Sequence, residues 1–340
     1  MEFRQIEPFS AVTVPVEHQP TRPRQPGAVS HLPITDPLTP TIFHEAWWLD
    51  AAAPGAWSEV TVQAGGRIVG RMPFLLRRES LGRAACVMPE VTHFLGPAVE
   101  AGNGAPCNRA LKVAQITREL LEQLPPAGFF NQRMHRGVED VLVFAEQGYQ
   151  TLVQFTFEIA PEAPDQIWAN MRDKTRNIIR RAEERHELAD CLPPAAFAAY
   201  YTANVENSGH GSYYREADIA RVTEAALARN RGRIIAARTA EGRIAGAIFC
   251  VWDQSTCYYL LSTRDKGIDQ GATSQLIWEA IRHAAGLGLT FDFDGLLTKG
   301  NRVFFTGFGG VVRPRYVAWR KTRSYRMTTH LANLYHRLCG

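Results

Sequence analysis

The sequence lacks several features that mark particular classes of protein. Its six cysteines form no CxxC pair and no zinc-finger spacing, so no disulfide framework is expected and a reduced, cytoplasmic protein is favoured. Unbroken apolar runs are short, such as Ala247–Trp252, whereas a membrane-spanning helix needs about 20 residues. The opening MEFRQIEPFS has an early Glu and no apolar core, so we expect no secretory signal. The histidines do not cluster as ligands, and no metal site is expected.

Acidic residues are missing from one end of the chain. No Asp or Glu follows Asp294, whereas residues 295–340 contain nine Lys or Arg. The net charge of +4 therefore combines −5 over residues 1–294 with +9 over the remaining segment. A concentrated cationic segment attracts phosphate-bearing partners. The alternative is a solvated basic tail.

The chain is long enough for about two domains. It has 340 residues, of which 45% are hydrophobic, as expected for a folded protein. Eight of its 20 prolines fall in the first 40 residues, which predicts an extended arm over 1–40. We expect an N-terminal domain over 41–160, a C-terminal domain over 161–320, and a basic C-terminal helix over 321–340.

Hydrophobic periodicity predicts a mixture of strands and helices. The predicted strands are Glu59–Gln63, Arg67–Leu76, Gly128–Arg133, Asp140–Ala145, Thr151–Ile159, Arg233–Thr239, Ile244–Trp252, Thr256–Ser262, Leu289–Phe293 and Tyr316–Trp319. The predicted helices are Leu111–Leu124, Asp165–His186, Ala195–Asn207, Glu216–Arg229, Ala272–Ala285 and Lys321–Leu338. The aromatic and glycine-rich stretch Asn301–Gly310 is interpreted as a turn.

One short segment occurs twice. Gly66–Gly70 (GRIVG) is similar to Gly242–Gly246 (GRIAG), and each opens an apolar strand after a tight turn. The two are half a chain length apart, which is consistent with a duplication. The alternative is that Gly-Arg is simply a common hairpin start.

A strand, a loop and a helix follow one another around Gly271. The order predicts free backbone N–H groups at the start of the helix, and these groups can bind a pyrophosphate. Leu261 on the strand and Gly271, Ala272 and Thr273 at the helix start are the candidate cofactor-binding residues. The alternative is an ordinary connection with a glycine before a helix.

Two carboxylates close the strand that follows this helix. In Phe291–Gly295 (FDFDG), alternation places Asp292 and Asp294 on one face of the strand. Either carboxylate could accept a proton from an attacking amine, with its pKa raised by its neighbour. Tyr259, on the preceding strand, is a third catalytic candidate. Tyr258 and Tyr259 point to opposite faces of that strand, so one is expected to face the core and the other the cleft beside the two carboxylates. The alternative is a solvated strand end paired with an Arg.

These segments, taken in order, resemble the Fem-like branch of the GNAT acyltransferase superfamily. Lys174–Glu183 (KTRNIIRRAE) is similar to the basic helix of that branch, and Gly271–Ile281 to its phosphate-loop helix. Phe291–Gly295 and the aromatic-glycine stretch Phe304–Gly310 complete the set, and Phe43–Leu49 (FHEAWWL) is similar to the start of the branch's N-terminal half.

The resemblance implies an α+β protein of two tandem GNAT-like domains, each a mostly antiparallel twisted sheet flanked by helices. It also implies direct transfer of an acyl group to an amine without a covalent enzyme intermediate. The expected co-substrate is acetyl-CoA or another acyl-CoA. The chain departs from the GNAT phosphate-loop pattern at Ile268 and Thr273.

We therefore expect an N-acetyltransferase that acts on an amine of a sugar nucleotide or another cell-envelope or polysaccharide precursor. The candidate substrate-binding residues are Lys174, Arg176, Arg180, Tyr213, Tyr214, Arg302 and Phe305. One alternative is a Fem-like enzyme that transfers an amino acid from charged tRNA to a peptidoglycan precursor. Another is a non-catalytic binding module. DNA is not an expected partner, tRNA is a partner only under the first alternative, and the C-terminal helix is the expected place of any peripheral membrane contact.

Overall fold

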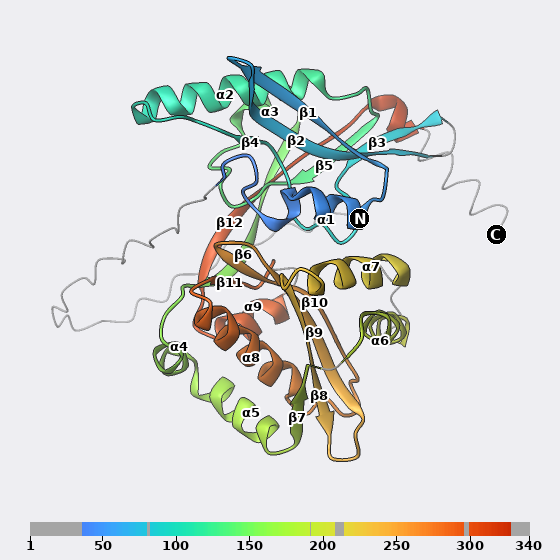
Figure 1. Ribbon diagram of the computed structural model, residues 1–340, viewed down its shortest axis with the longest axis vertical. Coiled ribbons are helices and arrows are strands. Elements are labelled where there is room, and N and C mark those ends of the chain that lie inside the picture. The colour runs from blue at the N-terminus through green and yellow to red at the C-terminus, as the bar shows by residue number, and fades with distance from the viewer. Residues whose placement is uncertain (1–35, 80–81, 191, 208–213, 296–298, 328–340) are drawn as a thin grey trace, which may run out of the picture. The chain divides into compact units, whose positions relative to one another are not determined.

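The computed structural model describes residues 36–79, 82–190, 192–207, 214–295 and 299–327 (Figure 1). The first half begins with a short 3₁₀ helix (Ile42–His44) and α1 (Ala46–Ala52). It continues with β1 (Trp57–Ala64), β2 (Arg67–Arg78), β3 (Ala84–Val87), β4 (Ala98–Val99), α2 (Pro106–Gln123), β5 (Phe129–Arg133), α3 (Leu142–Glu146) and β6 (Gln150–Ile159).

The second half begins with helices and one short strand. These are α4 (Pro164–Asn170), α5 (Asp173–Glu183), β7 (His186–Ala189), α6 (Pro194–Asn207) and α7 (Glu216–Leu227). They are followed by β8 (Gly232–Thr239), β9 (Ile244–Trp252), β10 (Thr256–Arg264), α8 (Ala272–Gly286), β11 (Thr290–Asp292), α9 (Lys299–Thr306) and β12 (Val311–Lys321).

The strands form one mostly antiparallel sheet. Its order is β1-β2-β3-β5-β12-β6-β11-β10-β9-β8-β7, and β4 pairs with β2 beside this row. The parallel pairs are β3 with β5 and β10 with β11. Helices pack against the sheet in both halves, with α2 on β1 and β2, and α8 on β8 to β11. The expected α+β class is confirmed.

Seven elements occur twice in the same order. β1, β2, β3, α2, β5, α3 and β6 make up the first repeat, and β8, β9, β10, α8, β11, α9 and β12 make up the second. The repeats exchange their last strands: β6 pairs with β11 of the second repeat, β12 pairs with β5 of the first, and β6 and β12 pair with each other. In Figure 1, β12 (red) runs beside β6 between the two sets of strands.

The two Gly-Arg segments occupy equivalent places in the repeats. Gly66 and Gly242 have φ of 79° and 78°, the left-handed conformation that glycine adopts readily, and β2 and β9 begin just after them. Farther along these strands, Gly70 faces Ile116 of α2 and Gly246 faces Leu276 of α8. Each glycine lets the helix of its repeat lie close to the strand, which supports a duplication.

Gly70→Ala is expected to lower the free energy of unfolding by about 1–3 kcal/mol. The added methyl group would collide with the Cγ2 atom of Ile116 and force the side chain or helix α2 to move. Gly246→Ala is the matched control, because its methyl group would lie 3.3 Å from Leu276 Cδ1 and requires only a small adjustment. Urea unfolding of both variants measures the difference. Equal losses would show that α2 has room to shift.

One predicted helix is divided in two. The expected helix Asp165–His186 breaks at Met171 and Arg172, which have extended backbone conformations between α4 and α5. The N–H of Arg172 donates to the carbonyl of Gly307 at 3.0 Å. This tertiary hydrogen bond replaces the helical one, so the break is set by packing against the end of α9. Helix α5 ends at Glu183, and strand β7 begins at His186, the last residue of the predicted helix.

Two further predictions are wrong in type. The predicted strand Asp140–Ala145 contains helix α3, and the Asp140 side chain accepts the N–H of Leu142 at 2.9 Å at its start. Local side-chain bonds of this kind compete with strand pairing. The predicted turn Asn301–Gly310 is helical as far as Thr306, where α9 ends. Phe304 in α9 packs edge-on against Phe308 just after the helix, with 5.4 Å between their ring centroids.

The C-terminal helix lies mostly outside the described residues. Residues 323–327 are helical, but Lys321 still belongs to β12, which is longer than the predicted strand Tyr316–Trp319. The predicted arm over 1–40 likewise lies largely outside the described residues. Among the helices that are described, none is long and apolar enough to cross a membrane.

A buried cluster joins the first helix of the chain to the second repeat. Phe43 and Trp48 are fully buried and pack in one cluster with Phe197, Phe249 and Tyr258. The ring centroids of Phe43 and Tyr258 are 5.2 Å apart. The cluster also contains Val91, Phe94 and Leu95, so the segment after β3 is fixed beside β10.

Candidate active site at the exchanged strands

The acidic end of β11 is bound to both exchanged strands. Asp292, the last residue of β11, is fully buried. One of its carboxylate oxygens accepts the Thr156 hydroxyl of β6 at 2.6 Å, and the other pairs with the guanidinium of Arg315 on β12. A buried carboxylate needs such partners to remain ionised. Asp292 is therefore held in place by the two exchanged strands.

Asp294 lies beyond the end of β11 in an unusual backbone conformation. Its φ of 61° is in the left-handed region, which is uncommon for residues other than glycine. The N–H of Asp294 donates to Asp292 Oδ1 at 2.8 Å, and the N–H of Gly295 donates to the Thr156 hydroxyl at 3.1 Å. The network around Asp292 thus fixes the turn that carries the second carboxylate.

The two oxygens of the Asp294 carboxylate have different surroundings. Oδ2 contacts Nδ1 of His93, whereas Oδ1 is buried and has no hydrogen-bond partner among the described residues. Only 3% of the Asp294 side chain is exposed. Buried polar atoms in native proteins are nearly always hydrogen-bonded, so an unpaired one is a candidate contact for a substrate.

His93 connects Asp294 to a tyrosine hydroxyl. Burial, together with the guanidinium groups of Arg133 and Arg315, lowers the pKa of His93, so the ring is neutral at neutral pH. Nδ1 then donates to Asp294, and Nε2 accepts the hydroxyl of Tyr214 at 3.2 Å. Burial raises the pKa of Tyr214 to about 12, which keeps this hydroxyl protonated. The three side chains form a continuous hydrogen-bonded chain.

The surrounding charges are paired with one another. Arg315 lies 3.7 Å from Glu158 as well as against Asp292, and Glu158 also accepts Arg136 Nη2 at 3.2 Å. Burial lowers the pKa of Arg315 to about 10, so it stays positively charged at neutral pH. Asp294 differs from its neighbours because its carboxylate meets a neutral imidazole. Among the carboxylates of this network, it is the one best placed to accept a proton.

The predicted cofactor residues surround a helix start that is already capped. The carboxylate of Asp269 accepts both the N–H and the hydroxyl of Thr273 at 2.9 Å, and the N–H of Ala272 donates to the Asp269 carbonyl. Gly271 has a φ of 99° and faces Ile178 of α5. Ala272 and Leu261 are buried. A pyrophosphate at this helix start would have to displace Asp269.

The aromatic candidates gather next to the place where β10 and β11 separate. The strands pair in parallel as far as Tyr258 and Asp292, and Tyr259 lies just beyond this point. Its ring centroid is 6.4 Å from that of Phe305 and 6.5 Å from that of Phe293. Burial raises the pKa of Tyr259, so this hydroxyl is protonated. Tyr259 and Phe305 share this aromatic cluster.

The predicted basic residues are spread over the surface of α5 and α9. Arg176 donates to the carbonyls of Trp168 at 3.2 Å and Ala169 at 2.9 Å. These carbonyls, in the last turn of α4, thereby gain a hydrogen-bond donor. Arg180 bonds to Asn177 and stacks on Trp168, while Lys174 and Arg302 are exposed. Tyr213 lies outside the described residues, whereas Tyr214 belongs to the hydrogen-bonded chain.

Sequence reasoning missed His93 as a site residue. No motif surrounds it, and its partner Asp294 is 201 residues away in the sequence. One signal was present: His93 stands within the mostly apolar segment Val91–Pro97, and a titratable group in such a segment needs a specific partner when it is buried. The same reasoning applies to Arg315 on β12.

Comparisons with known proteins agree with this architecture. Residues 169–304 match the family model of the acetyltransferase (GNAT) domain. No curated protein matches the chain in sequence. The structure is similar to that of FemX, with a TM-score of 0.59 and 13% identity over 80% of this chain and 90% of that one.

Two other solved structures have the same fold over most of their length. One is the C-terminal domain of a protein assigned as a lysylphosphatidylglycerol synthetase from Agrobacterium fabrum, with a TM-score of 0.54 and 11% identity over 88% of this chain and 95% of that one. The other is L-PGS from Bacillus licheniformis, with a TM-score of 0.50 and 16% identity over 84% of this chain and 90% of that one.

The family match and the fold together define the class of protein. Residues 169–304 form a GNAT acetyltransferase domain, and the protein is an acyltransferase. The chain as a whole shares its fold with FemX, and the domain match agrees with the sequence resemblance to GNAT acyltransferases. Asp292 and Asp294 lie inside the matched domain, whereas His93 comes from the first repeat.

Proposed function

We propose that the protein is an N-acyltransferase that transfers an acyl group directly to an amine. The observation that carries the proposal is the buried chain Asp294–His93–Tyr214, whose Asp294 Oδ1 is unpaired among the described residues. An acceptor amine that is protonated at neutral pH must lose that proton before its nitrogen can attack, and a carboxylate backed by a neutral histidine can accept it.

Each residue of the chain has a separate part in the proposed reaction. Asp294 Oδ1 accepts the N–H of the acceptor amine and takes its proton. His93 fixes the carboxylate through Nδ1–H, and Tyr214 fixes the ring through Nε2. The amine nitrogen then bonds to the acyl carbon, the bond from that carbon to the sulfur of the donor breaks, and the departing thiolate takes up a proton.

The donor we propose is acetyl-CoA or another acyl-CoA. The match to a GNAT acetyltransferase domain favours this class. For a donor to bind at the start of α8, Asp269 must first move, because it already accepts the N–H groups that a pyrophosphate would use. Removal of that carboxylate should therefore strengthen binding of an acyl-CoA if the donor binds at α8.

The acceptor we propose is an amine on a phosphate-bearing precursor, such as a sugar nucleotide of polysaccharide or cell-envelope synthesis. Exposed Lys174 and Arg180 on α5 and Arg302 on α9 provide positive charge on the second half of the chain. Charge of this sign concentrates anionic substrates near a site.

The test is a release assay in which free thiol from acetyl-CoA is measured with a panel of amino-sugar nucleotides. Thermal unfolding with acetyl-CoA is measured in parallel for the wild-type protein and Asp269→Ala. We expect thiol release with at least one amino-sugar nucleotide. We expect none with the same sugar nucleotide when a hydroxyl replaces its amine. A larger thermal shift for Asp269→Ala would place the donor at α8.

Two results would overturn parts of the proposal. No thermal shift with any acyl-CoA at millimolar concentration would exclude this donor class. Transfer from aminoacyl-tRNA in the same assay, with no transfer from acyl-CoA, would replace the donor and leave the roles of Asp294 and His93 to be tested separately.

A further inference from the structure

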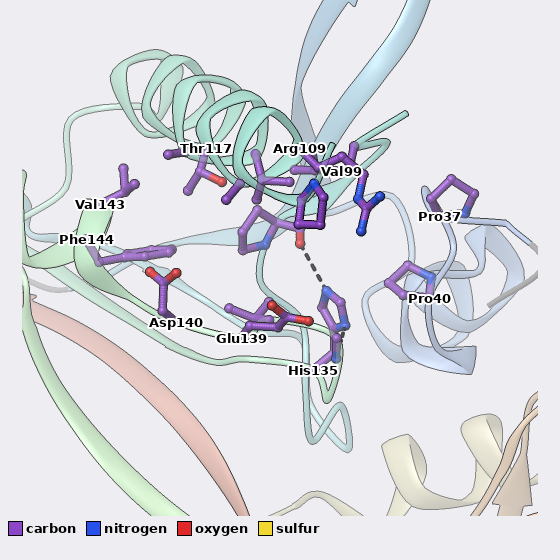
Figure 2. Close-up of a pocket in the computed structure, with 18 residues that line it drawn as sticks. Pro37, Pro40, Val99, Arg109, Thr117, His135, Glu139, Asp140, Val143 and Phe144 are labelled. Carbon is purple, nitrogen blue, oxygen red and sulfur yellow. Dashed lines mark hydrogen bonds between the residues drawn. The ribbon is translucent and has the colours of Figure 1, made fainter. Parts of the chain in front are cut away.

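The first repeat contains a cavity away from the Asp294 network. Its volume is about 350 Å³, which is within the range of small-molecule sites. It lies between the first half of α2, the segment around β4, and the loop that joins β5 to α3 (Figure 2). Pro97, Val99, Val143 and Phe144 contribute apolar walls.

A threonine with a mostly buried side chain faces this cavity. Thr117 of α2 lines it and is only 5% exposed. Its hydroxyl has no hydrogen-bond partner among the described residues. A ligand group in the cavity can therefore bond to this hydroxyl without displacing a side chain or backbone partner. Figure 2 shows Thr117 on the helix above the cavity.

The other buried polar group of the wall is already satisfied. His135 is 6% exposed, its Nε2 bonds to the carbonyl of Pro97 at 3.0 Å, and its Nδ1 accepts the N–H of Gly137 at 3.1 Å. Burial lowers the pKa of His135 to about 4, so the ring is neutral. His135 therefore contributes a wall without charge.

The charged groups of the cavity are exposed and mostly negative. Glu139 and Asp140 line it from the loop after β5, and Arg109 lines it from α2. Arg109 already donates to the carbonyl of Gly104 at 2.8 Å. The two carboxylates outnumber the guanidinium, so a cationic end group is attracted and a phosphate is repelled.

We propose that this cavity is a second binding site, for a primary amine with an apolar body. The apolar body fills the space between Val99 and Phe144, the ammonium group is at Glu139 and Asp140, and the Thr117 hydroxyl bonds to a polar atom at the inner end. The proposal concerns binding alone and does not depend on the reaction proposed above.

Calorimetric titration of the full chain at pH 7.5 tests this site with four probes: hexylamine, hexanol, hexanoate and 6-amino-1-hexanol. We expect hexylamine to bind at least about tenfold more tightly than hexanol, and hexanoate more weakly than hexanol. We expect 6-amino-1-hexanol to bind more tightly than hexylamine, and Thr117→Val to abolish that advantage.

Two further variants locate the binding. Glu139→Gln combined with Asp140→Asn should reduce the affinity for hexylamine to that for hexanol. Ala114→Phe, which fills the cavity from α2, should abolish binding of every probe, whereas Glu187→Gln, which changes an exposed carboxylate on β7, should bind all of them as the wild type does. Equal affinity for hexylamine and hexanol, preference for hexanoate, absence of binding, or binding unchanged by Ala114→Phe would each overturn the proposal.

Discussion

Asp294→Asn is expected to reduce kcat for acyl transfer by about 10²–10⁴-fold, the usual effect of losing a general base. Asn has the same shape and can still accept a hydrogen bond from His93 Nδ1, but it cannot take a proton from the amine. His93→Gln should give a loss of similar order because it removes the group that orients Asp294 and connects it to Tyr214. The measurement is the steady-state rate of thiol release.

Two control variants separate catalysis from folding. Glu187→Gln changes an exposed carboxylate on β7 and should leave kcat unchanged. Asp292→Asn removes the closer of two carboxylate partners of the buried Arg315 and should lower the free energy of unfolding by up to about 3–5 kcal/mol, because only Glu158, at 3.7 Å, then faces that charge. Asp294→Asn should unfold at nearly the wild-type temperature. A kcat within threefold of the wild type would refute the assigned role of Asp294.

Acid is expected to destabilise the protein between about pH 6.5 and pH 4. Burial lowers the pKa of His44, His93 and His135 in the folded state. Below pH 6.5 the unfolded chain binds protons on these rings that the folded chain does not bind. Stability is therefore complete above this pH and falls below it, by up to about 4 kcal/mol per pH unit if all three rings remain neutral when folded.

Urea unfolding at pH 7.5, 6.5 and 5.5 measures this slope. His135→Gln should reduce the slope by about one third, whatever its effect on stability at pH 7.5, because one of the three titrating rings is gone. A free energy of unfolding that is constant from pH 7.5 to 5.5 would show that these rings bind protons equally in the folded and unfolded states.

The sequence predicted most of the repeated strands and the longer helices, since their periodicity is local. Strand β9 and helix α8 appear with nearly the predicted bounds because each has a continuous apolar face. Elements decided by distant contacts were not predictable. The break at Arg172 depends on the carbonyl of Gly307, and Phe305 of α9 packs against Phe293 beyond β11, with 4.5 Å between the ring centroids.

The candidate site shows the same division. Asp292 and Asp294 could be found from Phe291–Gly295, because two carboxylates after an apolar strand are costly unless they have a purpose. The sequence could not predict that Arg315 pairs with Asp292 and His93 with Asp294, because both partners come from elements far away in the sequence. The Asp269 cap was visible as an acidic residue just before a helix and could have been recognised from the sequence.

The exchange of β6 and β12 has a consequence for how the chain can be divided. If the chain is cut between residues 160 and 164, the N-terminal fragment keeps β5 without β12, and the C-terminal fragment keeps β11 without β6. Each fragment then presents an unpaired edge that is complementary to a strand in the other, and open edges of this kind promote association. The two fragments are thus natural partners for reconstitution, and a split reporter joined at this point should bring them together only if both strands can cross.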